Sequence, residues 1–141
     1  AMKILLAVDG SDYTRRMLVY IAEHRSTFGT GNEYTVFHSV LAVPHRAAAF
    51  VGPDMVRSYY DDEARIVLDP IRNFLKEHDI ESRFEHEIGN PGNEIAQAAE
   101  AGRFDLVVMG SHGHNVFKSL VLGSVATKVL AACTVPVLLV R

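Results

Sequence analysis

Glycine and serine residues at fixed spacing in the last third of the chain could bind an anion. Gly110 and Gly113 lie three residues apart, and the pair Gly123–Ser124 follows after nine intervening residues. Because glycine has no Cβ, its backbone can adopt positive φ and approach a ligand closely, and successive N–H groups in such a turn form an anion-binding nest. The spacing therefore indicates a phosphate-binding loop, with a purely structural turn as the alternative.

A second anion site is predicted where the next helix begins. Gly123, Ser124 and Val125 open a segment with helical spacing that is expected to run to Ala132. The first N–H groups of a helix lack intrahelical partners and carry partial positive charge, and the Ser124 hydroxyl can donate to a phosphate oxygen. With the glycine turn, this start would make two separated cradles joined by residues 115–122, which suits a polyphosphate. An ordinary helix start is the alternative.

Other phosphate and catalytic motifs are absent from the sequence. It contains no G-x-x-x-x-G-K-[ST] loop, and no G-x-G-x-x-G follows the first apolar run. Ser111 lies in G-S-H-G rather than in the G-x-S-x-G of a nucleophile elbow. His112 and His114 alone make a weak zinc pattern, whereas Mg²⁺ carried by nucleotide phosphates would need few protein ligands.

The elements that must position these loops alternate between strands and helices. Pro70 lies inside a predicted helix and predicts a kink or a break there, and residues 44–53, which show no clear period, are expected to form a mobile loop. The alternation favours one parallel sheet with helices on both faces. Strands are expected at residues 3–8, 34–43, 81–88, 104–110 and 135–140, and helices from 11 or 12 to the glycines at 29–31, over 54–78, from about 93, and over 124–132.

A loop after the first strand is expected to complete the site. In open α/β sheets, ligands bind beyond the carboxyl ends of the strands, where the strand order reverses. If the first and fourth strands are neighbours, residues 9–11 and residues 110–113 face each other. Asp9 is then either a helix cap or a carboxylate that contacts the ligand. His38, in the second strand, is expected to be a hydrogen-bonded core histidine.

Size, charge and cysteine content limit the class of protein. A chain of 141 residues is expected to form one domain, and the net charge of −3 comes without a dense basic block, which argues against a nucleic-acid surface. No apolar run approaches the roughly 20 residues that cross a membrane. Cys133 is the single cysteine, so we expect a buried structural thiol, no internal disulfide and a cytoplasmic protein.

Three segments closely resemble the universal stress protein family. They are KILLAVDGSD near the start, MGSHG followed nine residues later by GSVATKVL, and TVPVLLVR at the end. The ATP-binding branch of that family has the pattern G-x2-G-x9-G-[ST], and Gly110, Gly113, Gly123 and Ser124 occupy its fixed positions. The resemblance covers essentially the whole chain, in order.

The resemblance implies an open five-stranded parallel sheet in the order 3-2-1-4-5, of the Rossmann-like, adenine nucleotide alpha hydrolase-like class. It implies ATP as the ligand, accompanied by Mg²⁺ on its phosphates, and a homodimer that pairs through Val135–Val140. The implied contacts are Ala7, Val8, Ser39 and Val40 for adenine, Asp9 for ribose or metal, Met109, Gly110, His112 and Gly113 for ribose and phosphates, and Gly123, Ser124 and Val125 for the distal phosphates.

The function implied is that of a dimeric regulatory or stress-response protein that holds ATP for a protein partner the sequence does not identify. Hydrolysis would be slow at most, because the loops contain no evident general base or arginine finger. An adenylate-forming enzyme and a nucleotide-free dimerisation module are the alternatives. Where many relatives have basic or glycine-rich residues, this chain has His114 and residues 115–117, and Lys118 is a candidate compensating contact.

Overall fold

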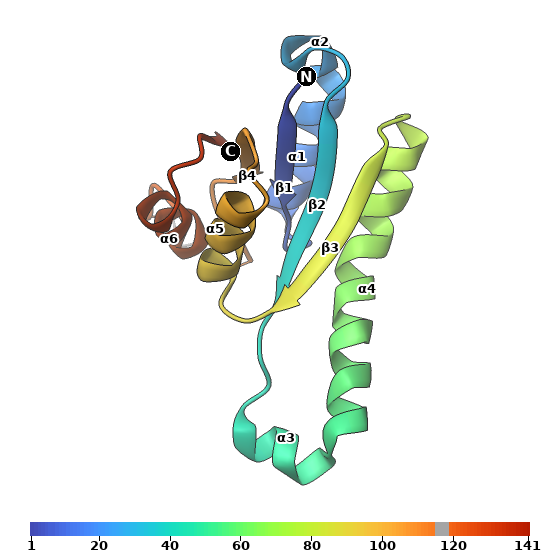
Figure 1. Cartoon of the computed structure of the whole chain (residues 1–141), viewed down its shortest axis with the longest axis vertical. Helices are drawn as coiled ribbons and strands as arrows, with labels where there is room; N and C mark the ends of the chain where they lie inside the picture. The colour runs from blue at the N-terminus through green and yellow to red at the C-terminus, as the bar shows by residue number, and fades with distance from the viewer. Residues whose placement is uncertain (115–118) are drawn as a thin grey trace.

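Five parallel strands form one sheet in the order β3-β2-β1-β4-β5, as expected (Figure 1). The computed structural model describes residues 1–114 and 119–141, so the expectation for residues 115–117 and the candidate contact of Lys118 lie outside the described residues. The strands are β1 (Lys3–Ala7), β2 (Glu33–Val40), β3 (Ser82–Ile88), β4 (Leu106–Gly110) and β5 (Val137–Val140). The helices are α1 (Asp12–Glu23), α2 (Arg25–Phe28), α3 (His45–Val51), α4 (Pro53–Glu77), α5 (Pro91–Ala101) and α6 (Ser124–Ala132).

Helices cover both faces of the sheet. Alternate residues of β1 point to opposite sides, and both sides are buried, which explains why this strand is apolar without interruption. Ile4 and Leu6 belong to the core under α1 and α4, whereas Leu5 and Ala7 belong to the core under α5 and α6. No helix in the described part of the chain is both long and apolar enough to cross a lipid bilayer.

The segment between β2 and β3 differs from the prediction in two ways. Residues 44–53 were expected to form a mobile loop, but His45–Val51 is helical and ends at Gly52, whose φ is +91°. Of the two outcomes expected at Pro70, a kink or a break into two helices, the break is wrong, because α4 is one helix of 25 residues. Pro70 is exposed, and so is Ile66, whose carbonyl loses its helical donor, so water can replace the missing hydrogen bond.

Two smaller predictions also need correction. The first helix was expected to continue to the glycines at 29–31, but α1 ends at Glu23 and a separate turn, α2, precedes Gly29. Cys133 was expected to be buried, but it is only half-buried. Its partial desolvation raises the pKa of the thiol, which keeps it in the less reactive protonated form.

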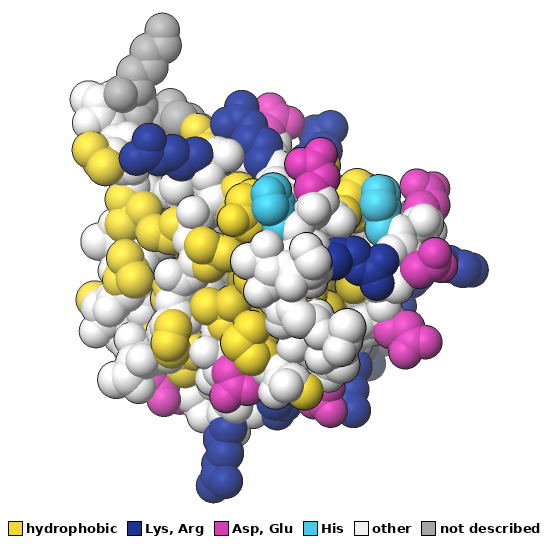
Figure 2. All heavy atoms as spheres, turned by 90° about the horizontal axis from the view of Figure 1, so that it is seen from above, with side chains coloured by type: hydrophobic (Ala, Val, Ile, Leu, Met, Phe, Trp, Pro, Cys, Tyr) yellow, Lys and Arg dark blue, Asp and Glu magenta, His cyan; other side chains and the backbone are white. Residues whose placement is uncertain are grey.

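The two edges of the sheet differ in character. β3 is largely exposed, as predicted for an edge strand, and Arg83, Glu85 and Glu87 alternate along it. Each residue of β5, by contrast, is apolar and half-buried. Figure 2 shows hydrophobic side chains gathered on the side of the molecule where α6 and β5 lie, and charged side chains mainly elsewhere.

Candidate functional site

The loops that follow β1 and β4 meet at the carboxyl edge of the sheet. Ala7, the last residue of β1, is paired with Met109 of β4, so both chains leave the sheet side by side. The His114 ring then donates from Nε2 to the backbone oxygen of Asp9 at 2.7 Å. A Cβ on Gly113 would lie 2.8 Å from Oδ2 of Asp9. The predicted neighbourhood of the two loops is therefore confirmed.

Asp9 organises the turn that starts α1 without capping the helix itself. Its Oδ1 accepts hydrogen bonds from the Ser11 N–H and from the Thr14 hydroxyl, each at 2.9 Å. The Asp9 N–H donates to the Thr14 hydroxyl oxygen at 3.0 Å. Ser11 is the N-cap and accepts from the Thr14 N–H at 3.4 Å. Of the two alternatives for Asp9, the helix cap is wrong, and its Oδ2 faces the glycine loop.

The glycines of the β4 loop allow close packing rather than unusual backbone angles. Positive φ was expected at Gly110 and Gly113, but neither residue adopts it. A Cβ on Gly110 would lie 2.6 Å from the Tyr13 Cβ, a distance that real Cβ atoms essentially never show. The spacing of these glycines therefore reflects contacts with α1 and with the Asp9 loop that leave no room for a side chain.

The start of α6 packs directly against the same loop. The Gly123 N–H donates to the Ser111 oxygen at 2.8 Å, and a Cβ on Gly123 would lie 3.0 Å from the His112 Cα and 3.7 Å from the Gly113 nitrogen. The expected separation of the two segments is thus wrong, because the start of α6 contacts the β4 loop directly. Gly123 is the N-cap and provides no side-chain hydrogen bond, so the first N–H groups of α6, including that of Ser124, remain available to an anion.

The side chain of His112 holds this loop in place. Its Nε2 donates to the Leu120 oxygen at 3.0 Å, which leaves Nδ1 to accept from the Ser111 hydroxyl at 3.0 Å. The ring also packs against Tyr13, with the centroids 5.1 Å apart. A contact between the His112 ring and ribose or phosphate would replace one of these hydrogen bonds, whereas its backbone lies at the junction with Gly123.

The ends of β1 and β2 are joined through Val8. Its N–H donates to the Phe37 oxygen at 2.9 Å, and its oxygen accepts from Nδ1 of His38 at 2.9 Å. His38 is 9% exposed, which confirms the prediction of a hydrogen-bonded core histidine. Burial lowers the pKa of His38, and the bond to Val8 and the negative charge of Asp9 oppose that effect only in part.

The residues expected around adenine are gathered at this junction but are largely covered. Ala7, Val8 and Val40 are buried, and so is Ser39, whose hydroxyl donates to the Gly89 oxygen at 3.0 Å. Adenine contacts would therefore come from the rim of this junction and from backbone groups rather than from these side chains. Sequence reasoning missed the structural roles of Tyr13 and Thr14; the only signal was their position just after the DGSD turn.

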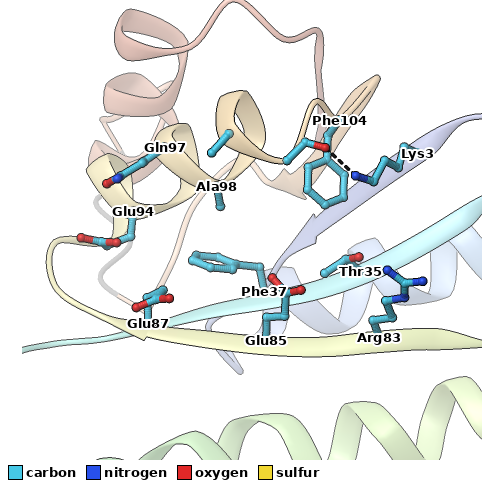
Figure 3. Close-up of a pocket in the computed structure, with 12 residues that line it drawn as sticks. Lys3, Thr35, Phe37, Arg83, Glu85, Glu87, Glu94, Gln97, Ala98 and Phe104 are labelled. Carbon is cyan, nitrogen blue, oxygen red and sulfur yellow. Dashed lines mark hydrogen bonds between the residues drawn. The ribbon is translucent and has the colours of Figure 1, made fainter.

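A groove of about 460 Å³ lies elsewhere, between α5 and the face of β2 and β3 opposite α4 (Figure 3). Glu87 of β3 and Glu94 of α5 line one end, Lys3 and Arg83 line the other, and Glu85 lies between them. Three carboxylates disfavour a polyphosphate there. In the described part of the chain, no group of three or more His, Cys, Asp or Glu residues could hold a metal ion.

Comparisons with known proteins agree with the geometry. A model of the universal stress protein family matches residues 1–141. Universal stress protein YxiE of Bacillus subtilis is 31% identical over 147 residues, which cover 99% of this chain and 98% of that protein. Among solved structures, universal stress protein UspA from Lactobacillus plantarum superposes with a TM-score of 0.80 at 21% identity, over 99% of this chain and 97% of that chain.

Two similar structures contain a nucleotide. An Arabidopsis thaliana protein of the universal stress protein family, with AMP bound, has a TM-score of 0.70 at 16% identity and covers 99% of this chain and 91% of its own. A universal stress protein in complex with cAMP has a TM-score of 0.67 at 18% identity and covers 99% and 96%. At these identities, the likeness shows a shared fold.

Proposed function

The chain belongs to the universal stress protein family, and we propose that within it this protein binds an adenine nucleotide, with ATP as its ligand, as a regulatory stress-response protein. The observation that carries the proposal is the junction of three segments at the carboxyl edge. There the Gly113 loop lies against the Asp9 carboxylate on one side and against the uncapped N-terminus of α6 on the other.

The chemistry of the junction favours a phosphate chain. The free N–H groups at the start of α6 attract negative charge, and the close packing of Gly123 on the β4 loop places them beside Gly113. Oδ2 of Asp9, whose Oδ1 is already hydrogen-bonded, would accept from a ribose hydroxyl or contact Mg²⁺ held by the phosphates. Relatives in complex with AMP and cAMP support an adenine nucleotide as the ligand class.

The remaining features of the proposal follow from the same residues. Residues 1–141 would act as one nucleotide-binding domain, placed in the cytoplasm because the chain has a single cysteine. We also propose a homodimer through the C-terminal strand, residues 135–140, because the strand lies at the edge of the sheet, each residue of β5 is apolar and half-buried, and an apolar edge strand needs a cover. Within the described junction the groups suited to ATP bind and orient it, so any hydrolysis would be slow.

The proposal is tested by adding one negative charge at the predicted phosphate site. Ser124→Asp places a carboxylate in the first turn of α6, where it favours the helix by about 0.3–1 kcal/mol but repels phosphate. Two unit charges at about 4 Å interact by about 4 kcal/mol at an effective dielectric constant near 20, so we expect at least tenfold weaker binding, which corresponds to about 1.4 kcal/mol. The matched control is Asn73→Asp, an exposed position near the C-terminal end of α4.

Binding of ATP, AMP and cAMP is measured by calorimetry for the wild type and both variants. The proposal expects the wild type to bind ATP most tightly, Ser124→Asp to bind it at least tenfold more weakly, and Asn73→Asp to match the wild type. A wild type that binds none of the three nucleotides would exclude an adenine-nucleotide function. Equal affinity for ATP in both variants would place the phosphates away from α6. Tighter binding of AMP or cAMP would correct the ligand and keep the site.

A further inference from the structure

The first half of α4 extends beyond the sheet with nothing packed on its outer face. None of its residues before Ala64 is buried, and Figure 1 shows this half projecting past the carboxyl edge together with α3. Met55 is 63% exposed, Tyr59 is 47% exposed and Ile66 is 67% exposed. Exposed apolar side chains gathered in this way mark an interaction surface.

These side chains form a seam on the side of α4 that faces away from the core. At about 100° per residue, Met55, Tyr59, Asp62 and Ile66 lie within roughly 60° of one another and about 180° from the centre of the buried stripe. Their spacing of four, three and four residues is the heptad spacing of a helix that packs against another helix. The buried stripe consists of Ala64, Leu68, Ile71 and Leu75. Helix α4 therefore carries two packing faces, and the sheet uses one of them.

The negative charge of Asp62 within the seam favours an antiparallel over a parallel orientation of two α4 helices. A parallel copy of the same helix would place Asp62 against Asp62, and like charges in direct apposition are unfavourable. In the antiparallel arrangement centred between residues 60 and 61, Met55 packs against Ile66 of the other copy. Tyr59 then faces Asp62, whose Oδ1 already accepts from Arg65 of the same helix, so the Tyr59 hydroxyl can donate to Oδ2. This register brings both aliphatic side chains together and gives the carboxylate a second hydrogen-bond donor.

We propose that two copies of this chain associate through α4, antiparallel, with Met55 against Ile66 and Tyr59 against Asp62. The seam, which we call the α4 seam, covers about three turns and about 17 Å of helix. A contact of about three helical turns is small beside stable interfaces, which bury about 1,200–2,000 Å², so the association depends on concentration. The α4 seam is separate from β5, and the proposal does not depend on nucleotide binding.

The contact also lies next to the proposed nucleotide site. A Cβ on Gly10 would lie 3.4 Å from Cγ2 of Val67, so the turn between Asp9 and Ser11 rests on the residue that follows Ile66. The outer face of α4 would hold the second copy while its inner face supports the loop after β1.

The test exchanges the aliphatic pair for a charged pair. Met55→Lys and Ile66→Glu are made singly and together, and the mass in solution is measured by sedimentation velocity up to about 100 μM protein, a range that detects micromolar dissociation constants. Both positions are mostly exposed, so all three variants are expected to fold, and circular dichroism melting curves check this. In the antiparallel register, the double variant places the introduced lysine of one copy against the introduced glutamate of the other.

The expected result is that each single variant has half the mass of the wild type at high concentration and that the double variant regains the full mass. The test compares the mass of each variant with the mass of the wild type, so it applies whether or not the copies also pair through β5. A wild type that stays monomeric, or single variants that keep the wild-type mass, would overturn the proposal. Single variants that dissociate without recovery in the double variant would also overturn it, because the partners in the register would be wrong.

Discussion

Gly123 offers the sharpest test of how closely the β4 loop and α6 approach each other. A methyl group at this position would lie 3.0 Å from the His112 Cα and 3.2 Å from the Ser111 oxygen, both of which are main-chain atoms. Backbone cannot rotate away as a flexible side chain can, so the helix start and the loop must separate. Overpacking of this kind costs about 1–3 kcal/mol.

Two substitutions at Gly123 separate this steric effect from helix capping. Alanine is a poorer N-cap than glycine, so Gly123→Ala weakens the start of α6 and also adds the steric overlap. We expect the two effects together to lower the free energy of unfolding by about 2–3 kcal/mol. Serine adds the same Cβ but restores a side-chain cap worth about 1 kcal/mol, so Gly123→Ser should lose about 1–2 kcal/mol. In thermal unfolding, Gly123→Ala should melt about 6–12 °C below the wild type.

Urea unfolding followed by circular dichroism measures both variants against the wild type, and calorimetry with ATP measures the site. Separation of α6 from the loop should also weaken ATP binding in both variants. A Gly123→Ser protein at least as stable as the wild type would refute the reasoning, since the loop would then accommodate a side chain without cost. The glycine would in that case reflect only the choice of N-cap.

Three further predictions concern the core and α4. Burial holds the pKa of His38 below its ordinary 6.5, so on acidification the unfolded chain binds a proton more readily than the folded one. The contribution of neutral His38 to the free energy of unfolding is therefore fully present above about pH 6.5. It falls below that pH by at most about 1.4 kcal/mol per pH unit. Urea unfolding between pH 5 and 8 should show this slope, and His38→Gln, which can still donate to Val8, should flatten it. Pro70→Ala restores a donor to the Ile66 carbonyl and should raise the free energy of unfolding by about 1–2 kcal/mol in the same assay. Leu75→Ala removes a side chain that is 1% exposed and should cost about 2–5 kcal/mol, whereas a cost below about 1 kcal/mol would contradict the described core.

The sheet could be predicted because its central strands are buried on both faces. The continuous apolar runs of β1 and β4 leave little choice but a covered parallel strand, and the glycines that follow mark where the chain turns. The bounds of α6 and the exposed character of β3 were predicted for similar reasons. Family resemblance supplied the strand order, since alternation alone allows several orders.

Helix α4 shows where periodicity is insufficient. Met55, Tyr59 and Ile66 recur at helical spacing and contribute to the periodic pattern that predicts a helix over residues 54–78, yet they face solvent. The residues that reach the core before Ile71 are Ala64 and Leu68. A helix with two apolar stripes gives one periodic signal, and the sequence does not say which stripe meets the sheet.

The proximity of the loops after β1 and β4 was predicted correctly, but the role of the glycines in that contact was not. The absence of a Cβ serves a left-handed backbone and a close contact equally well, so the sequence could not distinguish the two at Gly110 and Gly113. Helix α3 was missed because it lacks a period, although its three consecutive alanines and the following Gly52 are favourable for a short helix that ends there.

Ser111 connects the candidate site to the last residues of the chain. Its N–H donates to the Val140 oxygen at 2.8 Å, and its own oxygen accepts from the Gly123 N–H. During synthesis the N-terminal strands emerge first, but the loop after β4 gains this anchor only when β5 has joined the sheet. We therefore expect the proposed nucleotide site to be completed late in folding, only after β5 has joined the sheet.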